Sequence, residues 1–322
     1  MRICISGFFG WRNSGDEGIL LAIIDSLGSD HEYIVSTSLP FTLHDEYLLK
    51  LPRLSIAEVR EIRDLQTDYD LYLLGGGGLN WGFGWKQVLA TFTADKPCIN
   101  YGVGYRNDLL WGNPKLHGLY KSFLEQFDAI TVRDKSSQKM LDGIGVASTL
   151  TMCPSINLVE EKFACPTKMV VLCPRFEDVR SFEENSDQID WFVDTFKEIR
   201  EEVLLIPFAP YDRQDNKLDL SLCEMIAEKM GGARILKTDG TEPRKLKYAI
   251  SVSKLVVSGG RYHPLVWAST HNVPFQVYPK AEKIFKIRGF LEMHRKYGDK
   301  LKEMEKQNKE TLLRVAKEHG CN

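Results

Sequence analysis

Short apolar runs alternate with longer amphipathic stretches along the first half of the chain. The apolar runs are rich in β-branched and aromatic residues and predict buried strands; they span residues 2–6, 33–36, 71–74, 97–101 and 129–132. The amphipathic stretches predict helices over residues 17–27, 56–65, 115–127 and 135–141. Strands and helices that alternate in this way are typical of a parallel sheet covered on both faces.

The alternation stops at residues 153–168, which contain two prolines, two adjacent glutamates and no clear period, and which therefore predict a linker. It then resumes, with strands expected at 169–173, 203–207, 233–236, 255–258 and 275–278 and helices at 187–200, 218–230, 242–251 and 264–270. The chain thus predicts an α/β protein with two doubly wound, Rossmann-like domains that face a cleft. We expect an N-terminal domain over 1–154, a C-terminal domain over 168–281, and a long helical segment over 282–322 that packs back toward the N-terminal domain. The charges of that segment are typical of a solvated face.

The composition is that of an ordinary soluble protein. Of 322 residues, 43% are hydrophobic and 27% are charged, which are usual fractions for globular chains. Because 42 basic residues nearly balance 44 acidic ones, the chain is not a generally basic nucleic-acid binder. We expect no nucleic acid as a partner and no membrane-spanning segment. The oligomeric state stays open at this stage.

The cysteines and the N-terminus indicate a reducing, cytoplasmic environment. The seven cysteines form no Cys-x-x-Cys pair, and several lie within apolar strands, where they act as small core residues. Clustered ligand spacing for zinc is absent, so we expect no metal site. The first apolar run is too short for the hydrophobic part of a signal peptide and ends in glycine.

Two glycine-rich segments follow predicted strands. The first, residues 7–17, opens a helix whose N-terminus could face an anion; alternatively, Asp16 only caps that helix. The second is the four-glycine run at 75–78. Its glycines allow the backbone to approach either a ligand or the facing domain closely. The candidate binding residues of these two segments are Asn13, Asp16, Gly76 and Gly77. The neighbouring aromatic side chains could stack on a sugar or belong to the core; they are Trp81, Phe83 and Trp85.

Cationic residues also stand at the ends of predicted strands. Arg133 could bind an anion or form a structural pair with Asp134. Arg175 follows the first strand of the second domain, where its guanidinium suits a carboxylate or phosphate, unless it forms a surface ion pair.

The segment 258–264 combines two glycines, Arg261 and His263 at the start of a helix. A lone histidine is often structural, but the neighbouring glycines and arginine favour a functional role here. Lys280 follows the next strand. With Arg175 and Arg261, it would form a pocket for an anionic ligand.

The order of these motifs resembles that of the polysaccharide pyruvyl transferase family. The shared features are Gly-x-x-Gly-x-x-Asn-x-Gly-Asp-Glu at 7–17, an Asp-containing strand followed by glycines at 70–78, Thr-Val-Arg-Asp at 131–134, Arg-x-His at 261–263, and a Tyr–Lys element at 278–280. One departure is Cys153-Pro154, where the family usually has Asp-Pro.

The resemblance implies a GT-B-like fold and transfer of a pyruvyl group from phosphoenolpyruvate to two hydroxyls of a sugar, as a cyclic ketal. It implies that Arg175, Arg261 and His263 contact phosphoenolpyruvate, with His263 as the general acid and Arg261 also catalytic. Tyr262 and Lys280 would complete the donor site, and no cofactor would be needed beyond phosphoenolpyruvate as donor substrate. The partners would be this small-molecule donor and a carbohydrate acceptor, which would bind over the two glycine-rich segments through Asn13, Asp16, Gly76 and Gly77. Two alternatives remain at this stage: a nucleotide-sugar glycosyltransferase of the same architecture, and a non-catalytic glycan-binding relative, which the Cys153 departure suggests.

Overall fold

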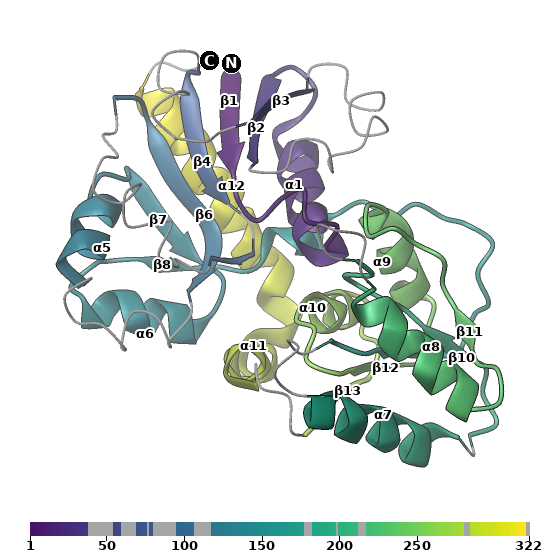
Figure 1. Ribbon diagram of the computed structural model, residues 1–322. Helices are drawn as coiled ribbons and strands as arrows, with labels where there is room; N and C mark the ends of the chain where they lie inside the picture. Colours follow the sequence, from purple (N-terminus) through teal and green to yellow (C-terminus); the bar gives the residue numbers. More distant parts are fainter. Residues whose placement is uncertain are drawn as a thin grey trace. The chain divides into compact units, whose positions relative to one another are not determined.

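The computed structural model describes residues 1–37, 54–58, 69–75, 77–79, 95–105, 117–176, 182–197, 199–211, 217–279 and 284–319 (Figure 1). The chain forms two compact units. The first unit contains residues 1–10, 19–157 and 289–322, and the second contains residues 11–18 and 158–288. The N-terminal segment 11–18 therefore belongs to the second unit, and the C-terminal segment from 289 belongs to the first.

The first unit is built on a parallel sheet with the strand order β3-β2-β1-β4-β6-β7-β8, and β5 pairs with β6 beside that path. The strands are β1 (Arg2–Ser6), β2 (Glu32–Thr37), β3 (Leu54–Glu58), β4 (Leu71–Gly75), β5 (Gly78–Leu79), β6 (Cys98–Tyr105), β7 (Ala129–Val132) and β8 (Thr149–Leu150). From β1 the chain moves outward to β2 and β3, then crosses to β4 on the other side. The order in which strands are added to the sheet thus reverses between β1 and β4. Doubly wound sheets open a crevice at such a reversal point.

Both faces of this sheet are covered, as its continuous apolar strands predict. The helical elements of this unit are α1 (Ser14–Leu27, from residue 19 on), α5 (His117–Leu124), α6 (Lys135–Gly143), the 3-10 turn η4 (Pro154–Asn157), α11 (Ile284–Tyr297, from residue 289 on), the 3-10 turn η5 (Gly298–Lys300) and α12 (Leu301–Glu318). Tyr72, Val103 and Phe123 belong to one large apolar cluster between the sheet and α5 and α6. Helix α12 contacts β6, β7 and η4.

One expectation for this unit needs correction. Leu54–Glu58 form the edge strand β3, in register with β2 through the pair Val35↔Ile56, so residues 56–58 of the helix expected over 56–65 are in a strand. Residues 59–65 lie outside the described residues. The ladder to β2 outweighs a weak helical period, because tertiary context decides short ambiguous segments. The long helical segment expected at the C-terminus is confirmed: it consists of α11 and α12, with the turn at Gly298–Lys300 between them; glycine is a poor helix former.

The second unit repeats the doubly wound pattern with the parallel order β11-β10-β9-β12-β13. Its strands are β9 (Val170–Cys173), β10 (Val203–Leu205), β11 (Arg234–Ile235), β12 (Leu255–Ser258) and β13 (Phe275–Val277), and its main helices are α7 (Phe182–Phe196), α8 (Asp219–Lys229), α9 (Pro243–Ser251) and α10 (His263–Thr270). Leu172, Phe192 and Ile226 pack together in the core between the sheet, α7 and α8. In this sheet the order in which strands are added reverses between β9 and β12, and we call this place its reversal point.

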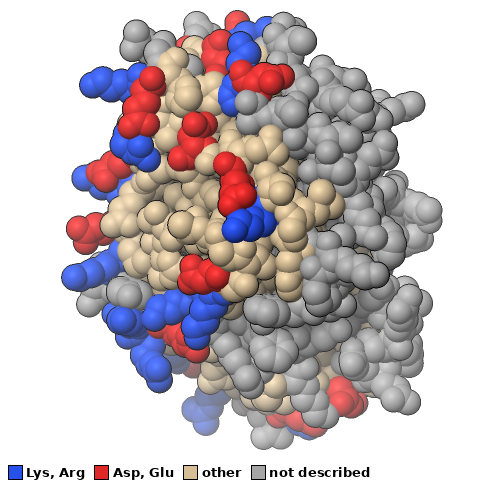
Figure 2. All heavy atoms as spheres, turned by 90° about the vertical axis from the view of Figure 1, so that its left-hand side faces the viewer, with Lys and Arg blue, Asp and Glu red and all other residues tan. Residues whose placement is uncertain are grey.

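The surface matches the near-neutral composition. Figure 2 shows both acidic and basic side chains over the coloured part of one face, with uncharged residues between them. Within the part of the chain that the structure describes, no helix is long and apolar enough to cross a lipid bilayer.

Candidate functional site

The two arginines expected to bind an anion stand at the reversal point of the second sheet. Arg175 follows β9 and Arg261 follows β12, and these strands are neighbours. The backbone N–H of Gly259 donates to the carbonyl oxygen of Cys173 at 2.8 Å, which joins the two strand ends. Ligands of open α/β sheets bind at the carboxyl ends of strands on either side of such a point. The topology therefore places both arginines at the position favoured for a ligand.

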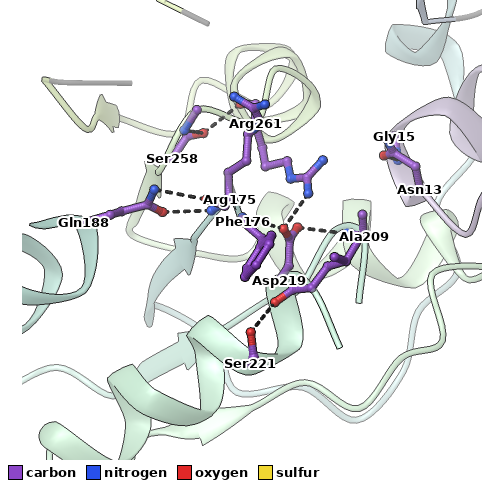
Figure 3. A network of polar contacts seen from close by, with 12 residues as sticks. Asn13, Gly15, Arg175, Phe176, Gln188, Ala209, Asp219, Ser221, Ser258 and Arg261 are labelled. Atoms are coloured by element: carbon purple, nitrogen blue, oxygen red, sulfur yellow. Dashed lines mark hydrogen bonds and ion pairs between the residues drawn. The ribbon is translucent and has the colours of Figure 1, made fainter. Parts of the chain in front are cut away.

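The backbone of Arg175 is held by Gln188 of helix α7. The N–H of Arg175 donates to Oε1 of Gln188 at 2.8 Å, and Nε2 of Gln188 donates back to the carbonyl of Arg175 at 3.1 Å (Figure 3). A Cβ atom on Gly259 would lie 2.2 Å from Oε1 of Gln188, so only glycine leaves room for this clamp. Arg175 is buried, which rules out the interpretation as a surface ion pair.

Arg261 forms an ion pair with Asp219, the first residue of helix α8 (Figure 3). The Asp219 side chain is fully buried, and that of Arg261 is 15% exposed. The loop before Arg261 is closed by Ser258, whose hydroxyl donates to the carbonyl of Arg261 at 2.7 Å and accepts from the N–H of Gly260 at 3.1 Å. Gly260 adopts φ of 122°, a conformation that favours glycine. The side chain and the backbone of Arg261 are thus both restrained.

His263 is the first residue of α10 and is buried. Its ring lies edge-on to that of Tyr262, at a centroid distance of 5.5 Å, and 6.3 Å from that of Trp267. A Cβ atom on Gly15 would lie 1.8 Å from Nδ1 of His263. The N-terminal turn of α1 therefore packs directly on the imidazole.

Helix α1 begins with Asn13 as its capping residue. Oδ1 of Asn13 accepts from the N–H of Gly15 at 3.2 Å, and its carbonyl accepts from the N–H groups of Asp16 and Glu17 at 2.9 Å. Asp16 lies in the first turn of the helix, and Asn13 rather than Asp16 occupies the capping position. A carboxylate in the first turn still interacts favourably with the helix dipole.

The start of α1 is tied to two further loops of the second unit. The N–H of Ser14 donates to the carbonyl of Phe208 at 2.8 Å, and the Ser14 hydroxyl donates to the carbonyl of Gly240 at 3.0 Å. These bonds, together with the contact on His263, bring Asn13 and Asp16 to the side of the sheet that carries Arg261. The glycine-rich segment 7–17, expected within the N-terminal domain, contributes its second half to the second unit.

The glycines after β4 have a packing role within the first unit. A Cβ atom on Gly7 would lie 1.9 Å from the carbonyl oxygen of Gly75, and the carbonyl of Gly77 accepts from the N–H of Gly104 at 3.2 Å. Close approach of the Gly75 carbonyl accounts for the glycine at position 7, and a Cβ atom on Gly75 would lie 2.9 Å from Cδ1 of Ile23. Gly76, Lys280 and the aromatic residues Trp81, Phe83 and Trp85 lie outside the described residues.

Arg133 is a buried structural residue. Its Nε lies 3.8 Å from Oδ2 of Asp134, and both side chains are 2% exposed. The guanidinium crosses β6 at Gly104, where a Cβ atom would be 2.4 Å from Nε. Oδ1 of Asp134 accepts from the N–H of Ser137 at 2.8 Å and so caps α6. Of the two interpretations of Arg133, the structural pair with Asp134 is confirmed.

Sequence reasoning missed Asp219, Gln188 and the role of Gly15. An acidic residue at the start of a helix usually indicates only a favourable interaction with the helix dipole, and Gln188 lies on a helix without any motif.

The Cys173 thiol lies beside Asp219. Burial raises the pKa of this thiol well above its ordinary value; Asp219 raises it further and Arg261 opposes the shift. A raised pKa disfavours the thiolate, so we assign Cys173 no nucleophilic role.

The arrangement can hold a small anion near two arginines, one of which has a restrained guanidinium, with a protonatable ring beside them. Guanidinium groups bind carboxylate and phosphate strongly, and an imidazole can donate or accept a proton near neutral pH. Among the residues that the structure describes, no three His, Cys, Asp or Glu side chains are grouped as metal ligands.

Solved structures with a similar fold are distant in sequence. The UDP-GlcNAc 2-epimerase of Neisseria meningitidis, bound to UDP-GlcNAc, has a TM-score of 0.55 at 11% identity, covering 98% of this chain and 100% of that one. MnaA of S. aureus in complex with UDP has a TM-score of 0.55 at 12% identity, and the match covers 89% of this chain and 81% of that one. HepE of Anabaena in complex with UDP and glucose has a TM-score of 0.51 at 14% identity, and the match covers 98% of this chain and 95% of that one. At these identities the likeness shows a shared GT-B-like fold.

Comparison with the sequences of curated proteins gives no significant match. The sequence profile of a family of transferases, in contrast, matches most of the chain. It covers residues 13–278, which include the N-terminal turn of α1, both arginines at the reversal point and the Arg-x-His motif. This chain belongs to the polysaccharide pyruvyl transferase family.

Proposed function

We propose that this protein transfers the pyruvyl group of phosphoenolpyruvate to two hydroxyls of a carbohydrate acceptor, forming a cyclic ketal in glycan biosynthesis. The observation that carries the proposal is the convergence of Arg175, Arg261 and His263 at the reversal point of the second sheet. Phosphoenolpyruvate has a carboxylate and a phosphate on a three-carbon frame. Two guanidinium groups suit these two anionic ends. Tyr262 and Lys280 belong to the same proposed donor site.

Ketal formation needs one proton donor at the methylene carbon of the donor. Protonation of that carbon leaves a cationic centre at C2, which the first sugar hydroxyl attacks with loss of its proton. The C2–O bond to phosphate breaks, the second hydroxyl closes the ring, and its proton also leaves. We assign the first proton to His263, since general acids near neutral pH are most often histidines. Arg261 stabilises the departing phosphate electrostatically.

The acceptor must lie beside the protonated donor. Asn13 and Asp16 belong to the turn that packs on His263, so hydroxyls bound to them would lie next to the imidazole. Asp16 offers carboxylate oxygens for this purpose, and we also assign Gly76 and Gly77 to the acceptor. The scheme requires no cofactor, and phosphoenolpyruvate as donor places the reaction in the cytoplasm.

Calorimetric binding of phosphoenolpyruvate to the wild type and to Arg261→Ala tests the donor site. Loss of a charge-assisted contact typically costs about 1.5–3 kcal/mol, so the variant should bind at least about tenfold more weakly. Arg234→Ala is a matched control, because Arg234 is an exposed arginine of the same sheet that pairs with Glu202. Unchanged affinity in Arg261→Ala would contradict the placement.

The same titrations separate the alternatives. A nucleotide-sugar glycosyltransferase should bind a UDP-sugar in preference to phosphoenolpyruvate. A non-catalytic relative should bind phosphoenolpyruvate but release no phosphate with any member of a broad acceptor panel. The proposed transferase should release one phosphate for each ketal formed.

A further inference from the structure

The carboxylate of Asp219 joins the ends of three neighbouring strands. Oδ1 accepts from the N–H of Phe176, which follows β9, and Oδ2 accepts from the N–H of Ala209, which follows β10, each at 2.9 Å (Figure 3). Oδ1 also pairs with Nη2 of Arg261, which follows β12. The two backbone bonds fix the carboxylate relative to the sheet, and the carboxylate in turn fixes the guanidinium.

Asp219 is the partner of the Arg261 side chain within the part of the chain that the structure describes. An arginine has many rotamers, and its side chain loses entropy when it is immobilised on a ligand. A group held in its bound orientation beforehand avoids that loss. Because Asp219 engages Nη2 on one side, it leaves the rest of the fork for a ligand.

We propose that Asp219 is a positioning residue that orients Arg261 for the anionic donor. This role rests on the proposed function, in which Arg261 binds phosphoenolpyruvate. Asp219 does not itself contact the donor, because a carboxylate would repel its phosphate; it acts through the arginine.

The alternative roles of Asp219 predict different binding. If Asp219 only stabilises the start of α8, its loss should lower stability and leave the donor affinity of the folded protein unchanged. If Asp219 mainly weakens the positive potential of Arg261, its neutralisation should tighten donor binding. A positioning role predicts weaker binding, and weaker binding that depends on Arg261.

A double-mutant cycle measured by calorimetry with phosphoenolpyruvate distinguishes these roles. Asp219→Asn and Arg261→Ala should each raise the Kd roughly tenfold or more. The double variant should bind within about twofold of Arg261→Ala, because a positioning residue has nothing to position once its arginine is gone. Thermal melting of each variant sets a temperature at which all are folded.

Two further variants keep the test decisive. Asp219→Glu retains the charge but lengthens the side chain, so it should also weaken binding and remains usable if Asp219→Asn fails to fold. Glu224→Gln removes an exposed carboxylate from the same helix, where it pairs with Lys217 at 2.7 Å, and should bind within about twofold of wild type.

The possible failures point to different conclusions. Wild-type or tighter binding by Asp219→Asn and Asp219→Glu, while Arg261→Ala binds weakly, would overturn the positioning role alone. Additive losses in the double variant would do the same. Unchanged binding by Arg261→Ala would overturn the donor site and the positioning role together.

Discussion

A Cβ atom on Gly15 would lie 1.8 Å from Nδ1 of His263, so the first turn of α1 rests on the imidazole ring. These two residues stand near opposite ends of the chain and belong to the two motifs that the family resemblance links. Their contact gives the Asn-x-Gly-Asp-Glu segment a physical reason for its glycine. It also brings the proposed acceptor residues Asn13 and Asp16 beside the proposed acid.

Gly15→Ala should reduce turnover at least about tenfold, because the added methyl group must displace the ring or the helix start. Overpacking of this kind typically costs about 1–3 kcal/mol of stability. Steady-state kinetics and thermal melting measure the two effects. Gly118→Ala is the matched control, since Gly118 is also near a helix start but has no atom within 4 Å of the position that its added methyl group would take. Equal activity of Gly15→Ala and wild type would show that the ring position is unimportant.

His263→Asn should lower turnover by about 10²-fold or more and leave donor binding nearly intact. A general acid acts mainly in the transition state, and its removal typically costs about 10²–10⁴-fold. The wild-type rate should fall as pH rises, because only the protonated imidazole can donate. Stopped assays at saturating donor measure turnover, and calorimetry measures donor binding separately. Near-normal turnover would leave the histidine a structural or binding role.

Asp16→Asn should raise the KM for the acceptor roughly tenfold, as expected for loss of a charge-assisted hydrogen bond. Asn13 caps the helix, so the stability lost through the helix dipole should be only about 0.3–1 kcal/mol. Glu303→Gln is a control that measures the contribution of a first-turn carboxylate to stability, since Glu303 lies in the first turn of α12. A large loss of stability with normal acceptor kinetics would assign Asp16 a purely structural role.

Glu305→Gln should stabilise the protein at neutral pH. Glu305 is fully buried in the first unit, and burial raises its pKa well above the ordinary 4.5, although the hydrogen bond from Asn308 and the nearby Tyr101 side chain oppose the shift. Above about pH 4.5 the unfolded chain therefore loses a proton that the folded chain keeps, and the free energy of unfolding falls as pH rises, by at most about 1.4 kcal/mol per pH unit. Glutamine cannot ionise and avoids this loss.

Thermal melting of wild type and Glu305→Gln between about pH 4 and pH 8 measures the difference across the range in which the unfolded carboxyl ionises. The two proteins should be similarly stable at the acidic end and diverge as pH increases. Glu303→Gln serves as the control here as well, because Glu303 is an exposed carboxylate of the same helix. A Glu305→Gln variant less stable than wild type at neutral pH would indicate that the carboxylate is ionised and paired in the folded state.

Much of the fold and part of the site follow from the sequence. Strand β12 is predicted at its observed bounds, and β1 likewise, because a run of apolar residues can be buried on both faces only within a covered sheet. Arg175 and Arg261 are recognisable as candidate ligands of an anion, since the end of each apolar run is visible along the chain. Their convergence follows from the rule that parallel strands end at the same edge.

The tertiary structure alone decided which distant residues meet. It brought Gly15 to His263, Asp219 to Arg261 and Gln188 to Arg175, and it made residues 54–58 a strand through pairing with β2. The physical reason is that hydrophobic periodicity reports which face of a segment is buried but not which partner covers it. A carboxylate at a helix start has the same local signature whether it faces water or holds a guanidinium, and only packing distinguishes the two.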